Sequence, residues 1–126
     1  MLRFNKRRKV SYSSLLIEFI EPMLTGHETD EEFLTKAIVG QIAWNYAVSD
    51  KAGLAMDGYM KQVLKSVTEQ YEDAQESLNA LVLRKGVCFE EYDQLILKVE
   101  QRHKPDGSTT LYVESAPASI LKKLGA

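Results

Sequence analysis

The apolar residues between Met60 and Leu81 are spaced to form one face of a long helix. They recur at alternating steps of four and three residues, a 3.5-residue period that lasts about three heptads and contains no Gly or Pro. The members of this stripe are Met60, Leu64, Val67, Tyr71, Ala74, Leu78 and Leu81. The pattern predicts one long amphipathic helix over about 59–85, with Gly86 as its stop, and its stripe has to be covered along its whole length.

Two ways of covering this stripe are open. The helix would be about 40 Å long at 1.5 Å per residue, whereas a compact chain of 126 residues is about 36 Å across. Because the helix spans or slightly exceeds the monomer, we predict self-association as a homodimer, through the Met60–Leu81 stripe or through the edge of a hairpin. The alternative is a small bundle in which the first two helices of the same chain cover the stripe.

The C-terminal third changes to the two-residue period of a β-strand. Lys-Pro-Asp-Gly at 104–107 separates two runs of alternating apolar and polar residues, and it supplies the residues that a tight turn favours. We predict an antiparallel β-hairpin over about 94–115 in which Val99 lies opposite Val113. The same register pairs Lys98 with Glu114, Glu100 with Tyr112 and Lys104 with Ser108. The apolar face of this hairpin is predicted to consist of Leu97, Val99, Leu111 and Val113.

Two further helices are predicted before the long one. Ser11, Ser13 and Ser14 offer N-caps for the first, and Pro22 lies inside its apolar pattern, where it should kink or end the helix. Thr29 and Glu32 form a capping box for the second, which runs to about Val48. Apolar residues cover nearly the whole circumference of this second helix, so we expect it to lie buried at the centre of the domain.

These elements define an α+β fold that is mainly helical, with three to four helices and a C-terminal antiparallel hairpin. A length of 126 residues favours one domain. We predict that residues 1–10 form a basic, flexible arm and that residues 11–126 form a single α+β domain.

The composition restricts the cellular compartments in which we expect the protein. There is one cysteine, which excludes an intrachain disulfide, and no apolar run approaches the ~18 residues of a membrane span. The basic start is followed by Glu18 and Glu21 without a small-residue cleavage site, which argues against a signal peptide. We therefore expect a cytoplasmic protein of bacterial type that does not associate with membranes.

The basic residues are concentrated at the N-terminus. The first nine residues carry five bases and no acid, while the rest of the chain has 11 bases against 18 acids. Five cations could neutralise several phosphates, so nucleic-acid binding through the arm is one hypothesis. The acidity of the body argues against a large nucleic-acid surface, and the arm could equally be a solubilising terminus. The five residues are Arg3, Lys6, Arg7, Arg8 and Lys9.

Trp44 is the largest side chain of the predicted central helix, and Asn45 follows it within an otherwise apolar stretch. A buried amide needs hydrogen-bond partners, so Asn45 could anchor a polar network or line a pocket beside Trp44. The pocket hypothesis would make the protein a small-ligand binder or an enzyme. A satisfied core amide is the alternative explanation.

Catalytic, cofactor-binding and metal-binding signatures are absent from the sequence. His27 and His103 are expected in exposed positions without further ligands nearby, and Cys88 lies in an apolar stretch that predicts a buried, inert thiol. One acidic row has the spacing of a single helix face, but no Glu-x-x-His motif accompanies it, so we interpret it as solvated. That row consists of Glu69, Glu72, Asp73 and Glu76.

The sequence therefore favours an interaction or scaffolding module over an enzyme. We expect a second copy of the chain or an unidentified protein as its partner, and no cofactor. The alternatives are a nucleic-acid-associated accessory protein that uses the basic arm and a small-ligand binder with a pocket near Trp44 and Asn45.

Overall fold

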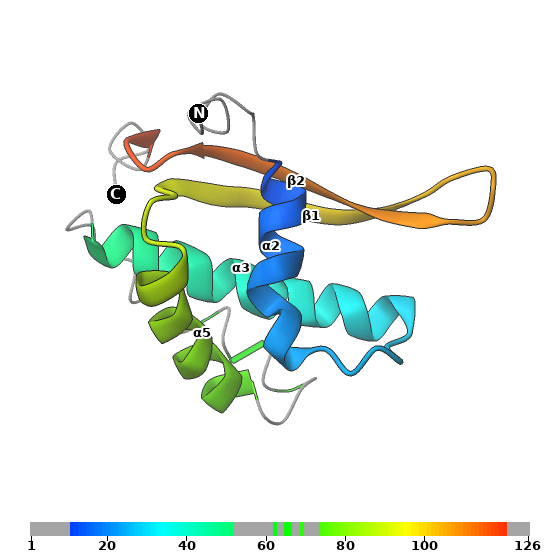
Figure 1. Cartoon of the computed structure of the whole chain (residues 1–126), viewed down its shortest axis with the longest axis horizontal. Coiled ribbons are helices and arrows are strands. Elements are labelled where there is room, and N and C mark those ends of the chain that lie inside the picture. Colours follow the sequence, from blue (N-terminus) through cyan, green and yellow to red (C-terminus); the bar gives the residue numbers. More distant parts are fainter. Residues whose placement is uncertain (1–10, 52–61, 63–64, 67–68, 70–73, 121–126) are drawn as a thin grey trace, which may run out of the picture.

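The computed structural model describes residues 11–51, 62, 65–66, 69 and 74–120. The prediction of a mainly helical α+β fold with a C-terminal hairpin is confirmed. In Figure 1 the hairpin runs alongside α3, while α2 and α5 pack across α3 and the hairpin tip extends past the end of α3. None of the described helices has an apolar stretch long enough to cross a bilayer. The described elements are α2 (Tyr12–Ile20), the 3-10 turn η1 (Glu21–Met23), α3 (Asp30–Lys51), α5 (Ala74–Cys88), β1 (Gln94–His103) and β2 (Thr109–Pro117).

Helix α2 begins and ends at the signals that the sequence carries. The Ser11 hydroxyl caps the helix by accepting from the N–H groups of Ser13 at 3.1 Å and Ser14 at 3.4 Å. The α-helix ends at Ile20 because Pro22 cannot continue its hydrogen bonding, and the chain goes on as η1. The buried face of α2 consists of Leu15, Leu16, Phe19 and Ile20.

Arg84 of α5 completes the C-terminal end of α2. Its Nε donates to the carbonyl of Phe19 and its Nη2 to the carbonyl of Glu18, both at 3.0 Å. These carbonyls lie in the last turn of α2, where Pro22 has no N–H to offer Glu18. The Glu18 carbonyl accepts from the Glu21 N–H, and the guanidinium of α5 adds a charged donor to each of these two carbonyls.

Helix α3 begins at the predicted capping box. The Thr29 N–H donates to Glu32 Oε1 at 2.9 Å, and the Glu32 N–H donates to Thr29 Oγ1 at 3.1 Å. The helix runs to Lys51, slightly beyond the predicted end at Val48. It is the central helix, as predicted, because residues on several of its sides are buried. These are Ala37, Val39, Gly40, Ile42, Ala43, Trp44, Val48 and Ser49.

The helix predicted over 59–85 is interrupted in the structure and ends later than predicted. The described residues 62, 65 and 66 are helical, but Glu69 lies in a turn and α5 begins at Ala74, so helical structure is not continuous over the predicted span. Most residues between 52 and 73 lie outside the described part of the chain. Gly86 is not the stop, because its backbone does not adopt a positive φ and the helix passes through it to Cys88.

The continuation of α5 past Gly86 places Cys88 at the surface. The buried positions of this region follow steps of four through Leu81, Lys85 and Phe89, and Cys88 does not fall on them. Its thiol is exposed. The prediction of a buried Cys88 is therefore wrong, because the next residue takes the inward position.

The same chain buries the C-terminal part of the Met60–Leu81 stripe. Leu78 is 7% exposed and Leu81 is 2% exposed, and α5 packs on α3 and α2. These two residues are therefore covered by other helices of the same chain, as in the bundle alternative. The members of the stripe whose side chains lie outside the described part of the structure are Met60, Leu64, Val67, Tyr71 and Ala74.

Strands β1 and β2 pair antiparallel in the predicted register, with Val99 opposite Val113. The Lys104 N–H donates to the Ser108 carbonyl at 2.8 Å and closes the loop. Gly107 has a φ of +91°, the left-handed conformation that this loop requires. The remaining predicted pairs, Lys98 with Glu114 and Glu100 with Tyr112, are also confirmed.

A β-bulge at Leu97 interrupts the predicted alternation. Ile96 and Lys98 face consecutive residues of β2, so Leu97 has no partner of its own. Leu95 and Ile96 are both buried, at 2% and 0% exposed, whereas Leu97 is 47% exposed. The prediction that Leu97 belongs to the apolar face is wrong, because the extra residue reverses the alternation at this point.

An aromatic cluster centred on Trp44 joins the elements. The Trp44 side chain is fully buried, as expected for the largest residue of the central helix. Its ring centroid lies 5.2 Å from that of Phe19 and 5.7 Å from that of Tyr12, both edge-to-face. Phe89 and Tyr92 approach it at 5.8 and 6.4 Å from the turn after α5. One cluster therefore holds α2, α3 and the start of the hairpin together.

The contact between α2 and α3 leads to a prediction about glycines. A Cβ at Gly40 would clash with the Ile20 side chain and meet Leu16 Cδ1 at 3.1 Å, whereas a Cβ at Gly86 meets nothing within 4 Å. We expect Gly40→Ala to lower the free energy of unfolding by about 1–3 kcal/mol through overpacking. Gly86→Ala, the matched control, should raise it by roughly 0.5–1 kcal/mol because alanine favours the helix. Urea denaturation would measure both, and equal effects would contradict the close packing of α2 on α3.

Candidate functional site

Three side chains of α3 form hydrogen bonds to the backbone of β1. Asn45 Oδ1 accepts from the N–H of Ile96 at 2.7 Å, and Asn45 Nδ2 donates to the carbonyl of Ile96 at 2.8 Å. Gln41 Nε2 donates to the same carbonyl at 3.0 Å, and Trp44 Nε1 donates to the carbonyl of Gln94 at 2.8 Å. We call these contacts the α3–β1 seam. Within it, the amide of Asn45 takes the place of a neighbouring strand.

The seam is where the structure places Trp44 and Asn45, the pair singled out in the sequence. Trp44 is fully buried, and both polar atoms of the Asn45 amide have partners. This arrangement is the polar network that the sequence offered as an alternative to a pocket. Gln41 belongs to the same network and was missed, although it lies one helical turn before Asn45.

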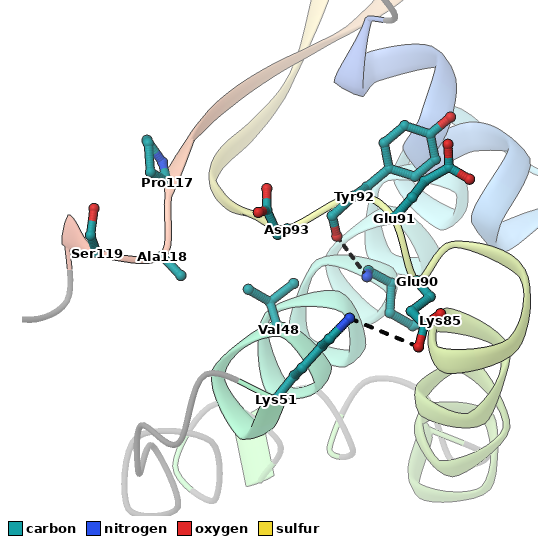
Figure 2. A pocket seen from close by; sticks show the side chains of 10 residues that line it. All are labelled: Val48, Lys51, Lys85, Glu90, Glu91, Tyr92, Asp93, Pro117, Ala118 and Ser119. Atoms are coloured by element: carbon teal, nitrogen blue, oxygen red, sulfur yellow. Dashed lines mark hydrogen bonds and ion pairs between the residues drawn. The ribbon is translucent and has the colours of Figure 1, made fainter. Parts of the chain in front are cut away.

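A pocket of about 520 Å³ lies where the C-terminal ends of α3 and α5 meet the two ends of the hairpin (Figure 2). Both signs of charge line it, and the exposed side chains of Lys51 and Glu90 approach to 3.9 Å. Trp44 and Asn45 are not among its lining residues. These are Val48, Lys51, Lys85, Glu90, Glu91, Tyr92, Asp93, Pro117, Ala118 and Ser119.

Lys85 is the buried polar residue of this pocket, at 4% exposed. Its Nζ donates to the carbonyls of Phe89 at 2.8 Å and Tyr92 at 2.7 Å, and it lies 4.7 Å from the centroid of the Trp44 ring (Figure 2 shows the Tyr92 contact). Burial lowers the pKa of the Lys85 amine, and the charge of Lys51 lowers that pKa further, while Asp93 and Glu90 raise it.

A buried amine with a lowered pKa is a candidate base or nucleophile. The geometry of Lys85 argues for a structural role, because two carbonyls and one ring face already occupy the three N–H directions of its ammonium. The amine holds the turn between α5 and β1 in place. The sequence contained a signal for this position, since Lys85 continues the three-and-four spacing of Leu78 and Leu81 onto the buried face.

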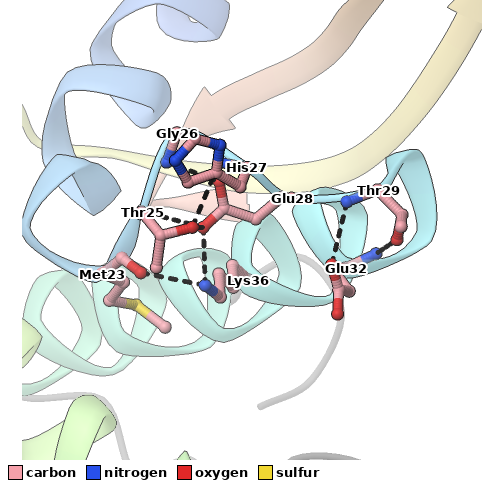
Figure 3. Close-up of polar contacts among 8 residues, drawn as sticks. All are labelled: Met23, Thr25, Gly26, His27, Glu28, Thr29, Glu32 and Lys36. Atoms are coloured by element: carbon pink, nitrogen blue, oxygen red, sulfur yellow. Dashed lines mark hydrogen bonds and ion pairs between the residues drawn. The ribbon is translucent and has the colours of Figure 1, made fainter.

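The carboxylate of Glu28 organises the loop between η1 and α3 (Figure 3). Its Oε2 accepts from the Thr25 N–H at 2.6 Å and from Lys36 Nζ at 2.7 Å, and its Oε1 accepts from the Gly26 N–H at 3.1 Å. Lys36 Nζ also donates to the carbonyl of Met23 at 3.0 Å. The Lys36 hydrogen bond, followed by that of the Thr25 backbone, lowers the pKa of Glu28 to about 2. Sequence reasoning missed this network. The nearest signal in the sequence was Gly26, which has a φ of +89° in the structure.

Strand β2 forms the open edge of the hairpin. In an antiparallel ladder, successive residues turn their N–H and C=O alternately toward the partner strand and away from it. Lys104 bonds to Ser108 across the ladder, and Ile96 turns its backbone groups away from β2 toward α3. The register therefore points the N–H and C=O of Leu111 and Val113 away from β1. No described residue bonds to these outward groups.

The two edges of the hairpin differ in their chemistry. The α3–β1 seam satisfies the edge of β1 near its start. The nine residues of β2 contain no Lys or Arg, one charged residue, Glu114, and a proline only at the last position, Pro117. Edge strands that avoid pairing usually carry lysines, prolines or a cover. Among the described residues, none protects the edge of β2 by backbone pairing along most of its length.

The face of the hairpin that carries Tyr112 is polar, and its side chains are paired within the chain. The guanidinium carbon of Arg102 lies 3.6 Å from the centroid of the Tyr112 ring, and its Nε donates to Glu100 Oε1 at 2.9 Å. The Tyr112 hydroxyl donates to Glu114 Oε2 at 3.0 Å. Since these side chains already have partners, the hydrogen-bonding groups left for another molecule are the backbone groups at the edge of the hairpin.

The other candidate residues of the sequence are dispersed. His27 and His103 are exposed, as expected, and Glu69 and Glu76 of the acidic row are exposed as well. Among the described residues, no group of three or more His, Cys, Asp or Glu side chains is placed to hold a metal ion. The candidates that lie outside the described residues are Glu72, Asp73 and the five bases of the arm, Arg3, Lys6, Arg7, Arg8 and Lys9.

No protein-family model, no curated protein and no solved structure matches this chain. The nucleic-acid hypothesis and the pocket hypothesis remain predictions. The feature that the geometry itself distinguishes is the contrast between the start of β1, where α3 satisfies the outward groups of Ile96, and β2, where those of Leu111 and Val113 have no partner among the described residues.

The seam predicts a specific cost for losing Asn45. Asn45→Ala leaves the Ile96 N–H without a partner, while Gln41 still reaches the Ile96 carbonyl. We expect the free energy of unfolding to fall by about 1–3 kcal/mol, the cost of one buried unsatisfied donor. Asn79→Ala is the matched control, since Asn79 is exposed and accepts only from Gln75 at 3.2 Å; its effect should stay within about 0.5 kcal/mol. Urea denaturation would compare them, and equal losses would contradict the seam.

The Glu28 network predicts a pH dependence of stability. Because folding lowers the Glu28 pKa from 4.5 to about 2, the stabilisation is complete above pH 4.5 and is lost as the pH falls toward 2. We expect the stability difference between the wild type and Glu28→Gln to shrink over that interval in thermal unfolding. Lys36→Gln removes the strongest cause of the shift, so it should move the loss to higher pH. A constant difference between wild type and Glu28→Gln down to pH 2 would argue against this account.

Proposed function

We propose that this protein is an interaction module that binds an extended strand along the open edge of β2. One observation carries the proposal: the outward backbone groups of Leu111 and Val113 have no partner among the described residues, whereas those of Ile96 are satisfied by α3. An extended polypeptide supplies the alternating donors and acceptors that such an edge lacks. This assigns the interaction role to the hairpin edge.

The side chains of β2 support the same occupant. Leu111 is 9% exposed and Val113 is half-buried, so an added strand would extend the apolar face that packs on the helices. On the opposite face, Tyr112 and Glu114 bond to each other and remain toward solvent. An incoming strand with the same alternation would therefore place its apolar residues on the buried side and its polar residues in water.

A peptide with the sequence of residues 108–118 is the probe for this edge. We expect a fluorescein-labelled peptide to bind the full-length protein, with a rise in fluorescence anisotropy. N-methylation of the peptide amide that corresponds to Val113 removes a donor that faces the protein, so it should weaken binding by roughly tenfold.

N-methylation at the amide that corresponds to Tyr112 is the matched control, because that amide faces away from the protein and should leave the affinity unchanged. For a monomeric protein, whose β2 edge is accessible, the absence of binding would contradict strand addition at the β2 edge, as would equal losses for the two methylated peptides.

A further inference from the structure

We infer that the strand bound by β2 is the β2 strand of a second copy of this chain, paired antiparallel about a twofold axis at Val113. The inference rests on the proposed function, since it names the partner of the same edge. Pairing of the two β2 strands gives a four-stranded antiparallel sheet in the order β1-β2-β2′-β1′, with the helices of each copy packed on its own hairpin. A closed twofold dimer of this kind uses both copies of the open edge and leaves no further β2 edge to pair.

The geometry of β2 restricts where the twofold axis can fall. The outward backbone groups belong to odd-numbered residues, such as Leu111 and Val113, so odd residues must pair with odd residues. An axis at residue 113 pairs Val113 with itself and lies at the midpoint of Thr109–Pro117, so the whole strand overlaps with its copy. Axes at residue 111 or 112 leave part of the strand unpaired. Full overlap therefore favours the axis at Val113.

Charge selects the same axis. At residue 113, Glu114 of one copy faces Tyr112 of the other, and Glu114 already accepts a hydrogen bond from the Tyr112 hydroxyl within each chain at 3.0 Å. Leu111 then faces Ser115 of the other copy. An axis one residue further along, at 114, would set the two Glu114 carboxylates directly opposite each other, which is unfavourable. The axis at 113 brings no like charges together.

Cysteine pairs test the dimer and its axis together. Tyr112→Cys/Glu114→Cys, made with Cys88→Ser to remove the exposed native thiol, places two cysteines opposite each other in a pair with Cα atoms about 4.5 Å apart. We expect mild oxidation of the full-length protein to give disulfide-linked dimers as the main species. The matched control Thr110→Cys/Tyr112→Cys has the same face and spacing but should remain unlinked, as should Tyr112→Cys alone, whose two copies would lie about 8 Å apart.

Light scattering on a size-exclusion column gives the second readout. The unmodified protein should have twice the 14.3 kDa mass of one chain at micromolar concentration. Linkage of the control pair would place the axis at residue 111, and linkage of Tyr112→Cys alone would place it at residue 112; either result overturns the inference. A monomer that still binds the β2 peptide also overturns it but keeps the proposed function, because two full chains then cannot approach where a peptide can. A monomer that does not bind the peptide overturns both.

Discussion

The hydrogen bonds of the α3–β1 seam are the constraint on which the rest of the structure depends. A two-stranded hairpin is marginal by itself, and each buried backbone group without a partner costs about 1–3 kcal/mol. Asn45 answers both problems, since its amide satisfies the N–H and C=O of Ile96 while it ties the strand to the central helix. Trp44 adds a connection to the core, because its ring lies in the aromatic cluster and its N–H binds the carbonyl of Gln94.

The seam also makes the two edges of the hairpin unequal. Before α3 is considered, both strands present the same kind of open edge. Asn45, Gln41 and Trp44 occupy the edge of β1 at its start, whereas the outward groups of Leu111 and Val113 in β2 are left without a partner in the described part of the chain. The interaction site that we propose is thus a consequence of how the core is assembled. It needs no dedicated pocket or charged patch.

Local signals in the sequence predicted the elements whose causes are local. The Thr29–Glu32 capping box, the stop near Pro22 and the register of the hairpin each depend on residues within a few positions of one another. The failures depend on distant contacts.

Gly86 has the residue type of a helix stop, yet α5 continues through it while the Lys85 amine lies against the Trp44 ring of α3. The site was open to prediction only in part, because the partner of Asn45 lies 51 residues away. The sequence showed that this amide needs a partner and that hairpin edges can pair, but only the position of α3 decides which edge is covered.

The bulge at Leu97 divides the hairpin into a short segment at the start of β1 and a longer segment that ends at the tip. Before the bulge, side chains of α3 bind the backbone of β1, whereas beyond Lys98 the strands contact the rest of the chain through side chains such as those of Leu111 and Gln101. Two residues added to each strand beyond the bulge would carry the tip about 7 Å further out and keep every side chain on its own face. A change in the length of the hairpin would therefore leave the seam unchanged, and it would change the span of β2 that a partner can pair with.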